Sequence, residues 1–96
     1  MQYSDGNIYA LTRTLTKREK EIVLLMCMGL TSKEIGKELY ISSLTVDKHK
    51  SNLIAKYNAR NGCQLIYKLM TCKAINPAEI NQKTQELLLN TYHSES

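Results

Sequence analysis

The chain has 96 residues, of which 43% are hydrophobic and 23% are charged, and its formal net charge is +4. This length suffices for one compact domain, and the composition is that of a globular protein, which excludes a disordered or fibrous chain. The richest apolar run, residues 22–28, is far shorter than the roughly 20 residues of a membrane-spanning helix and shorter than a well-flanked signal-peptide core. We therefore expect a soluble, cytoplasmic protein.

Positive charge is concentrated before residue 78. That part carries 12 basic and 6 acidic side chains, whereas in the rest Lys83 is outnumbered by Glu79, Glu86 and Glu95. The asymmetry favours a polyanionic partner for the first part, although mildly basic domains without such a partner are also common.

The cysteines give no sign of a metal site. Cys27, Cys63 and Cys72 are odd in number and lack the CxxC spacing typical of zinc ligands. We expect reduced thiols, no metal and no other cofactor.

In chain order, residues 1–14 have no helical period and are interpreted as a leader or linker. The first helix begins after Thr16, because Thr16 and Glu19 have the spacing of a capping box. It ends at Gly29, where a left-handed residue typically terminates a helix. Thr31 and Glu34 repeat the capping signature, so a second short helix begins at residue 32.

A third helix is predicted over residues 43–57, with Ser42 as its cap and a bend at residues 40–41 before it. At about 100° per residue, Val46 and Leu53 mark an inward stripe that also includes Lys50 and Tyr57. The residues on the opposite side, which point outward, are Leu44, Asp47, Lys48, Ser51 and Ala55.

A fourth helix begins at Asn61 and Gly62 and has an apolar stripe at residues 65, 66, 69 and 70. Asn76, Pro77 and Glu79 form a good opening for a fifth, peripheral helix. No segment alternates like a strand, so the predicted class is all-α: a four-helix domain over residues 15–73, with a helical C-terminal extension over residues 74–96.

The second and third helices, joined by a short turn, have the arrangement of a helix-turn-helix, in which the later helix lies in the major groove. Lys48 can donate to guanine, Asp47 can accept from the cytosine amino group, and the small Ser51 and Ala55 allow close approach. Simple solvation of this face is the alternative interpretation.

Three blocks in the same order carry a family resemblance: LTxRE at residues 15–19, GLTxKEI at 29–35 and ISxxTVxxH at 41–49. The stretch to about Met70 resembles the DNA-binding domain of the LuxR/FixJ/GerE family of bacterial transcription regulators. The resemblance implies that the third helix reads the major groove of double-stranded DNA, that neighbouring helix starts grip phosphates, and that the fourth helix pairs with a second copy in a homodimer. It also implies a bacterial protein that is associated with the nucleoid when bound.

Carried over residue by residue, the base-contacting positions are Asp47, Lys48 and Ser51, to which the helical geometry adds Leu44. The family commonly has lysine at position 47, so Asp47 either reads cytosine or weakens binding. The expected phosphate contacts are Thr31, Ser32, Lys33, Ser43, Thr45, Lys56 and Arg60. For Thr45 a local bond in the first helical turn is the alternative, and for Lys56 and Arg60 it is ordinary solvation.

The expected dimer interface comprises Cys63, Ile66, Tyr67 and Met70, with burial in the core as the alternative for Ile66. Leu24 and Met28 lie where the family tends to be polar. We expect either a missing regulatory domain or the segment containing Ile80, Leu87 and Leu88 to cover them.

The alternative function is a helical protein-interaction module, for example one that docks RNA polymerase, with an incidental basic face. An RNA polymerase contact is also compatible with the DNA-binding function. An enzyme requires a converging nucleophile and base, paired carboxylates or a metal set, and the sequence suggests none of these.

Overall fold

Within the part of the chain that the computed structural model describes, residues 15–95 with side chains through residue 89, five helices follow one another and no strand occurs. The all-α prediction is therefore confirmed, while the leader or linker expected at residues 1–14 lies outside the described residues. The helices are α2 (Lys17–Cys27), α3 (Ser32–Leu39), α4 (Ser43–Lys56), α5 (Gly62–Thr71) and α6 (Pro77–Glu95).

The helix starts follow their predicted caps. At α2, Thr16 Oγ1 accepts a hydrogen bond from the Glu19 amide at 3.1 Å, and Glu19 Oε1 accepts one from the Thr16 amide at 2.9 Å. The same reciprocal pair opens α3. Gly29, just beyond the C-cap of α2, has a φ of 88°, the left-handed conformation that glycine adopts without a steric penalty.

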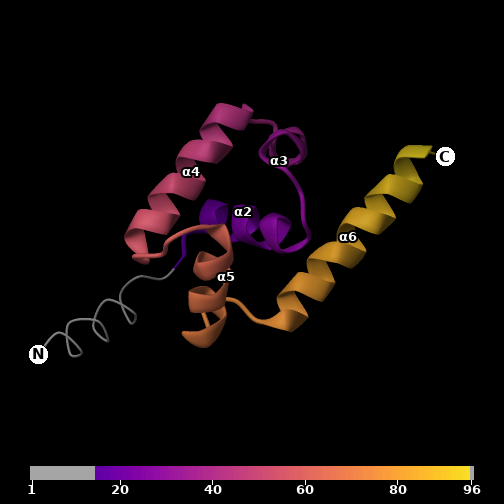
Figure 1. Cartoon of the computed structure of the whole chain (residues 1–96). Helices are drawn as coiled ribbons and strands as arrows, with labels where there is room; N and C mark the ends of the chain where they lie inside the picture. Colours follow the sequence, from indigo (N-terminus) through magenta and orange to yellow (C-terminus); the bar gives the residue numbers. More distant parts are fainter. Residues whose placement is uncertain (1–14, 96) are drawn as a thin grey trace, which may run out of the picture.

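The central helix is α2, which contacts α4 on one side and α6 on the other (Figure 1). It contributes to both hydrophobic clusters of the core. Val23 packs with buried residues of α4 and α5, whereas Leu25 packs with buried residues of α3 and α4. The largest fully buried side chains are Ile22, Val23, Leu25, Ile35, Val46, Leu53, Leu65, Leu69 and Ile75.

Helices α3 and α4 approach each other closely across a short turn. A Cβ atom added at Gly36 would lie 2.5 Å from the carbonyl oxygen of Ile41, so glycine is what permits this approach. Tyr40, the C-cap of α3, adopts a left-handed φ of 60°, and the Ile41 amide donates to the Gly36 carbonyl at 2.9 Å. These contacts fix the turn that sets the direction of α4.

The extension after residue 74 contains α6, which packs against α2 as one of the two expected coverings. Leu24 is only 9% exposed, and Ile80 and Leu87 pack against the two core clusters. The prediction was wrong for Leu88, which is 58% exposed. Leu88 lies one residue, about 100° of helix, beyond Leu87, so it cannot share the face that Ile80 and Leu87 present to α2.

Candidate nucleic-acid interface

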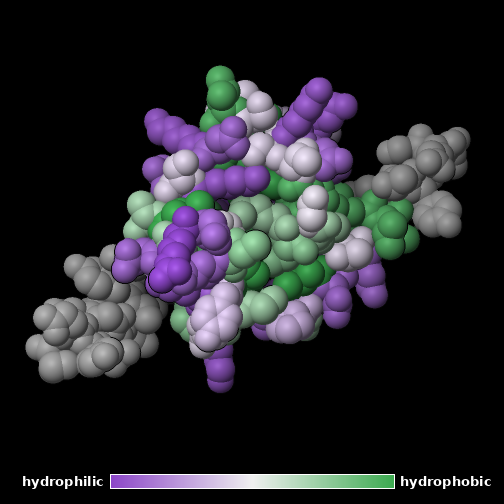
Figure 2. Space-filling model, in the orientation of Figure 1, coloured by the Kyte–Doolittle hydropathy of each residue, from purple (hydrophilic) through white to green (hydrophobic). Residues whose placement is uncertain are grey.

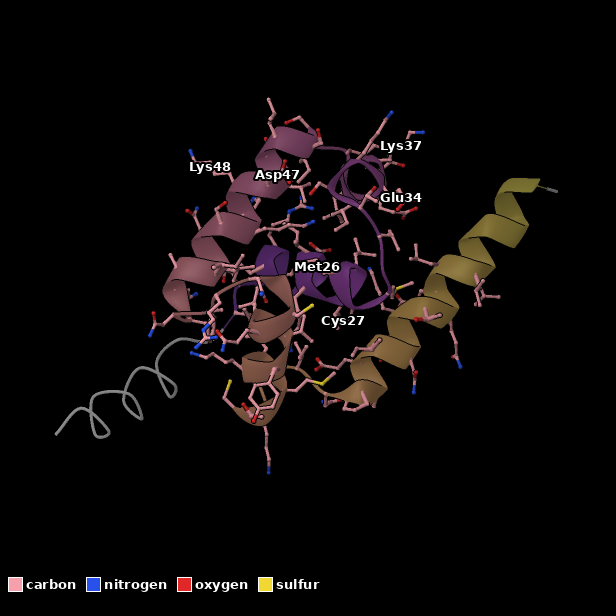
Figure 3. All side chains as sticks on the ribbon, in the orientation of Figure 1. Met26, Cys27, Glu34, Lys37, Asp47 and Lys48 are labelled. Carbon is pink, nitrogen blue, oxygen red and sulfur yellow. The ribbon has the colours of Figure 1, made fainter. Side chains whose placement is uncertain are left out.

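The outward surface of α4 is the centre of the candidate interface. Leu44, Lys48 and Ser51 are exposed at spacings of four and three residues, which places them on one stripe of the helix. Val46 and Leu53, on the opposite side, are fully buried. In Figure 3, Lys48 points away from the body of the protein. The side chains of this stripe are therefore accessible to a macromolecular partner.

Asp47 is also exposed, but it faces a different way. Ser32 Oγ, at the start of α3, donates a hydrogen bond to Asp47 Oδ1 at 2.5 Å. Figure 3 accordingly shows Asp47 on the side of α4 that faces α3, away from Lys48. A carboxylate has two oxygens, so Oδ2 still has capacity to accept from another donor.

The N-terminus of α3 combines a free lysine with unpaired backbone donors. The Glu34 side chain caps the Thr31 amide at 2.8 Å, and Thr31 Oγ1 in turn accepts from the Glu34 amide at 3.2 Å. The backbone hydrogen bond from Thr31 holds the pKa of the Glu34 carboxyl below its ordinary value. Among the described residues, the amides of Ser32 and Lys33 have no acceptor, and the exposed Lys33 ammonium has no ion pair.

The start of α4 is organised by local hydrogen bonds. Ser42 Oγ accepts from the Thr45 amide at 3.1 Å and lies 2.9 Å from Thr45 Oγ1. The hydroxyl of Thr45 is thus engaged within the first turn, as the alternative interpretation expected, although with a side chain. Ser43 is exposed beside it.

Lys56 is bound inside the domain. Its ammonium donates to Glu19 Oε1 at 3.1 Å, across from the start of α2. Burial acts to raise the pKa of Glu19, but hydrogen bonds from the Thr16 amide and Lys56 outweigh it and leave the pKa below its ordinary value. Arg60 is exposed, and its backbone amide donates to Gln64 Oε1 at 2.7 Å. Of these two cations, Arg60 is the more accessible.

The sequence comparison identifies the family. Residues 13–69 match the family described as bacterial regulatory proteins, luxR family, and this match covers more than half of the chain. The chain belongs to the luxR family. The luxR-type helix-turn-helix family consists of transcription regulators, not enzymes.

Three similar proteins each match more than half of the chain. Spore germination protein GerE of Bacillus subtilis is 41% identical over 56 residues, covering 58% of this chain and 76% of GerE. Transcriptional regulatory protein LiaR of Bacillus subtilis is 45% identical over 51 residues, covering 53% of this chain and 24% of LiaR. Transcriptional activator protein LuxR of Aliivibrio fischeri is 44% identical over 62 residues, covering 65% of this chain and 25% of LuxR. The chain thus matches about a quarter of LiaR and LuxR but three quarters of GerE.

The expected dimer residues of this luxR-family domain divide into two kinds. Cys63 and Tyr67 are exposed on α5, with Tyr67 at 67%. Ile66 and Met70 are half-buried and pack against the hydrophobic cluster around Leu65. For Ile66 this packing matches the core alternative, whereas Cys63 and Tyr67 are accessible to a second chain.

Two features of the interface have no signal in a single sequence. The Ser32–Asp47 bond joins residues 15 positions apart in two helices, and their contact depends on the angle of the turn. Tyr40 is 94% exposed at that turn, where the sequence predicted a bend at residues 40–41 and nothing about the exposure of the side chain. In the described residues, no helix is long and apolar enough to cross a membrane, and no group of His, Cys, Asp and Glu side chains could hold a metal ion.

Proposed function

We propose that the chain binds double-stranded DNA sequence-specifically to regulate transcription, with α4 in the major groove. The observation that carries the proposal is the accessible stripe of α4 opposite its buried Val46–Leu53 side. The major groove is wide enough to admit an α-helix, and each base pair presents there a distinct pattern of donors and acceptors. In this arrangement Lys48 donates to guanine, and Ser51 and Ala55 let the helix approach the groove floor.

We propose that Asp47 contacts a base and that its side chain is held in one orientation. With Oδ1 occupied by the Ser32 hydroxyl, Oδ2 is the acceptor offered to the amino group of cytosine. Ser32 acts here as a positioning residue, because its bond restricts the rotation of the Asp47 side chain before DNA arrives. This arrangement makes Asp47 a rigid acceptor rather than a flexible one.

Phosphate contacts then orient the domain. The free amides and the dipole of α3 favour an anion at Ser32 and Lys33, close to the capping Thr31. At the start of α4 the exposed Ser43 is accessible to a phosphate, whereas Thr45 can contact one only by exchanging its bonds with Ser42. Arg60 adds an exposed cation. Lys56 can take part only by exchanging its ion pair with Glu19. Such contacts set the register but do not select the sequence.

A homodimer on an inverted repeat completes the proposal. Cys63 and Tyr67 provide an accessible patch on α5, and Ile66 and Met70 lie half-buried beside it. A two-fold contact through this patch would place two copies of α4 on half-sites about one helical turn apart.

The test is selection of bound duplexes from a random DNA pool, followed by affinity measurements at increasing salt concentration. We expect one enriched motif with inverted symmetry, and an association constant whose logarithm falls linearly with the logarithm of salt concentration. If the chain does not bind duplex DNA even in dilute salt, the proposal is wrong and the protein-interaction module is favoured.

A further inference from the structure

Leu44 is an apolar side chain in an otherwise polar or small stripe. It is 78% exposed at the second position of α4, and Lys48 and Ser51 follow it on the same stripe. Figure 2 shows a hydrophobic projection over the N-terminal end of α4, next to hydrophilic atoms. A single exposed leucine is ordinary on a protein surface. This one is informative because of the surface on which it lies.

The position of Leu44 excludes a role in the core of the domain. Val46, two residues later, is fully buried against Ile22, Leu25 and Ile35, so Leu44 faces the opposite direction. The first turn of a helix that enters a groove is also the part that reaches furthest toward the bases. If the proposed function holds, Leu44 therefore lies against base edges.

The chemistry of the major groove leaves one favourable contact for such a side chain. Guanine, adenine and cytosine present hydrogen-bonding groups there, and thymine alone presents an apolar one, its 5-methyl group. A leucine placed against a donor or acceptor would remove its water without supplying a hydrogen bond. We infer that Leu44 recognises thymine by packing against this methyl group.

This inference rests on the proposed function and adds a specificity-determining residue to it. It also completes the stripe: Lys48 donates to guanine, Ser51 allows close approach, and Leu44 selects thymine at the adjacent end of each half-site. Replacing thymine by cytosine removes the 5-methyl group and with it the apolar surface that the leucine contacts.

The experiment removes the methyl group alone. After a binding site has been selected, each thymine in a synthetic duplex is replaced in turn by deoxyuridine, which keeps every hydrogen-bonding group. For the wild-type chain we expect at least one replacement per half-site to weaken binding about fourfold, the contribution of one buried carbon group. For Leu44→Ala we expect the same replacement to have no effect, because the two changes remove the same contact.

Leu88→Ala is the matched control. Leu88 is likewise an exposed leucine, at 58%, but it lies on α6, which contacts α2. This variant should retain the full sensitivity to deoxyuridine. Because Leu44 is exposed, Leu44→Ala should melt at the wild-type temperature, which shows that any change in binding does not come from unfolding.

The outcomes separate this inference from the proposed function. A random pool that yields no enriched motif defeats the proposed function itself. Two outcomes overturn the thymine inference and leave DNA binding in place. One is an enriched motif without thymine at the end of the half-site that Leu44 contacts, and the other is a Leu44→Ala variant that remains sensitive to every deoxyuridine replacement.

Discussion

Two regions of the molecule carry lysines: the outward surface of α3 and α4, which we call the helix-turn-helix surface, and the boundary between α2 and α6. The regions differ in whether these lysines form ion pairs with carboxylates of the domain. At the boundary, Lys20 donates to Glu79 at 2.8 Å, and within α6 Lys83 lies 3.9 Å from Glu86. On the helix-turn-helix surface, Lys33 and Lys48 are exposed and have no ion pair among the described residues. The pair of Lys20 with Glu79 joins α2 to α6, whereas the unpaired lysines are available for an external anion. The comparison predicts that the two regions can be disrupted independently.

Removal of residues 77–96 should have the largest effect, and on stability alone. It takes away Ile80 and Leu87 and exposes Leu24, at a cost of about 3 kcal/mol by the usual value for apolar burial. For a domain of this size we expect the melting temperature to fall by more than about 10 °C. Calorimetry or circular dichroism measures it, and DNA affinity below the new transition should be unchanged. An unchanged melting temperature would show that α6 does not stabilise α2.

Lys48→Ala and Lys33→Ala should weaken DNA binding without changing the stability of the fold. The two variants should differ in how the loss of affinity depends on the DNA sequence. Loss of Lys48 should cost about 1 to 3 kcal/mol and relax the preference at one base pair, since it removes a base contact. Loss of Lys33 should weaken all sequences similarly and reduce the salt dependence by about one phosphate. Affinities for single-base variants of the selected site provide the readout.

Lys83→Ala on α6 is the control for those two variants and should leave DNA binding unchanged. If Lys48→Ala and Lys33→Ala both weaken binding uniformly, the assignment of α4 to the groove is wrong. If Lys83→Ala matches them, the division between the two regions fails.

Asp47→Asn should change specificity through a contact that spans both helices. In asparagine the oxygen can still accept from Ser32, but a donating amino group replaces the second carboxylate oxygen and cannot accept from cytosine. The preference for cytosine at one base pair should therefore fall by about 1 to 3 kcal/mol. Ser32→Ala should reduce the same preference by about 1 kcal/mol, because it frees the side chain without removing the acceptor. A uniform gain in affinity for all sequences in Asp47→Asn would instead show that the carboxylate repels phosphate.

The parts of the structure that follow from local rules were predictable from the sequence. Capping pairs such as Thr16 with Glu19, and the terminator Gly29, depend only on residues a few positions apart, and the structure has them where they were predicted. The inward position of Val46 followed from helical period. Contacts between helices were not predictable, because they depend on crossing angles. Lys56 was expected to be accessible to phosphate, yet it pairs with Glu19, and Asp47 faces Ser32.

The smallest predicted effect tests the ion pair at the α2–α6 boundary. The hydrogen bond from Lys20 lowers the pKa of Glu79, so the pair stabilises the fold above the ordinary carboxyl range and the contribution is lost as pH falls through the lowered folded-state pKa. Because both side chains are partly exposed, the contribution is about 0.2 to 1 kcal/mol. Glu79→Gln should therefore melt a few degrees below the wild type at pH 7.

That difference in melting temperature between Glu79→Gln and the wild type should shrink as the pH falls through the lowered pKa of Glu79, because the wild-type carboxyl then also becomes uncharged. Added salt should reduce it at neutral pH, since a partly exposed pair is screened. DNA binding of the variant should be unchanged, which distinguishes a pair that joins two helices from the unpaired lysines of α3 and α4. A difference that is constant with pH would show that the charge of Glu79, and therefore its ion pair with Lys20, does not stabilise the domain.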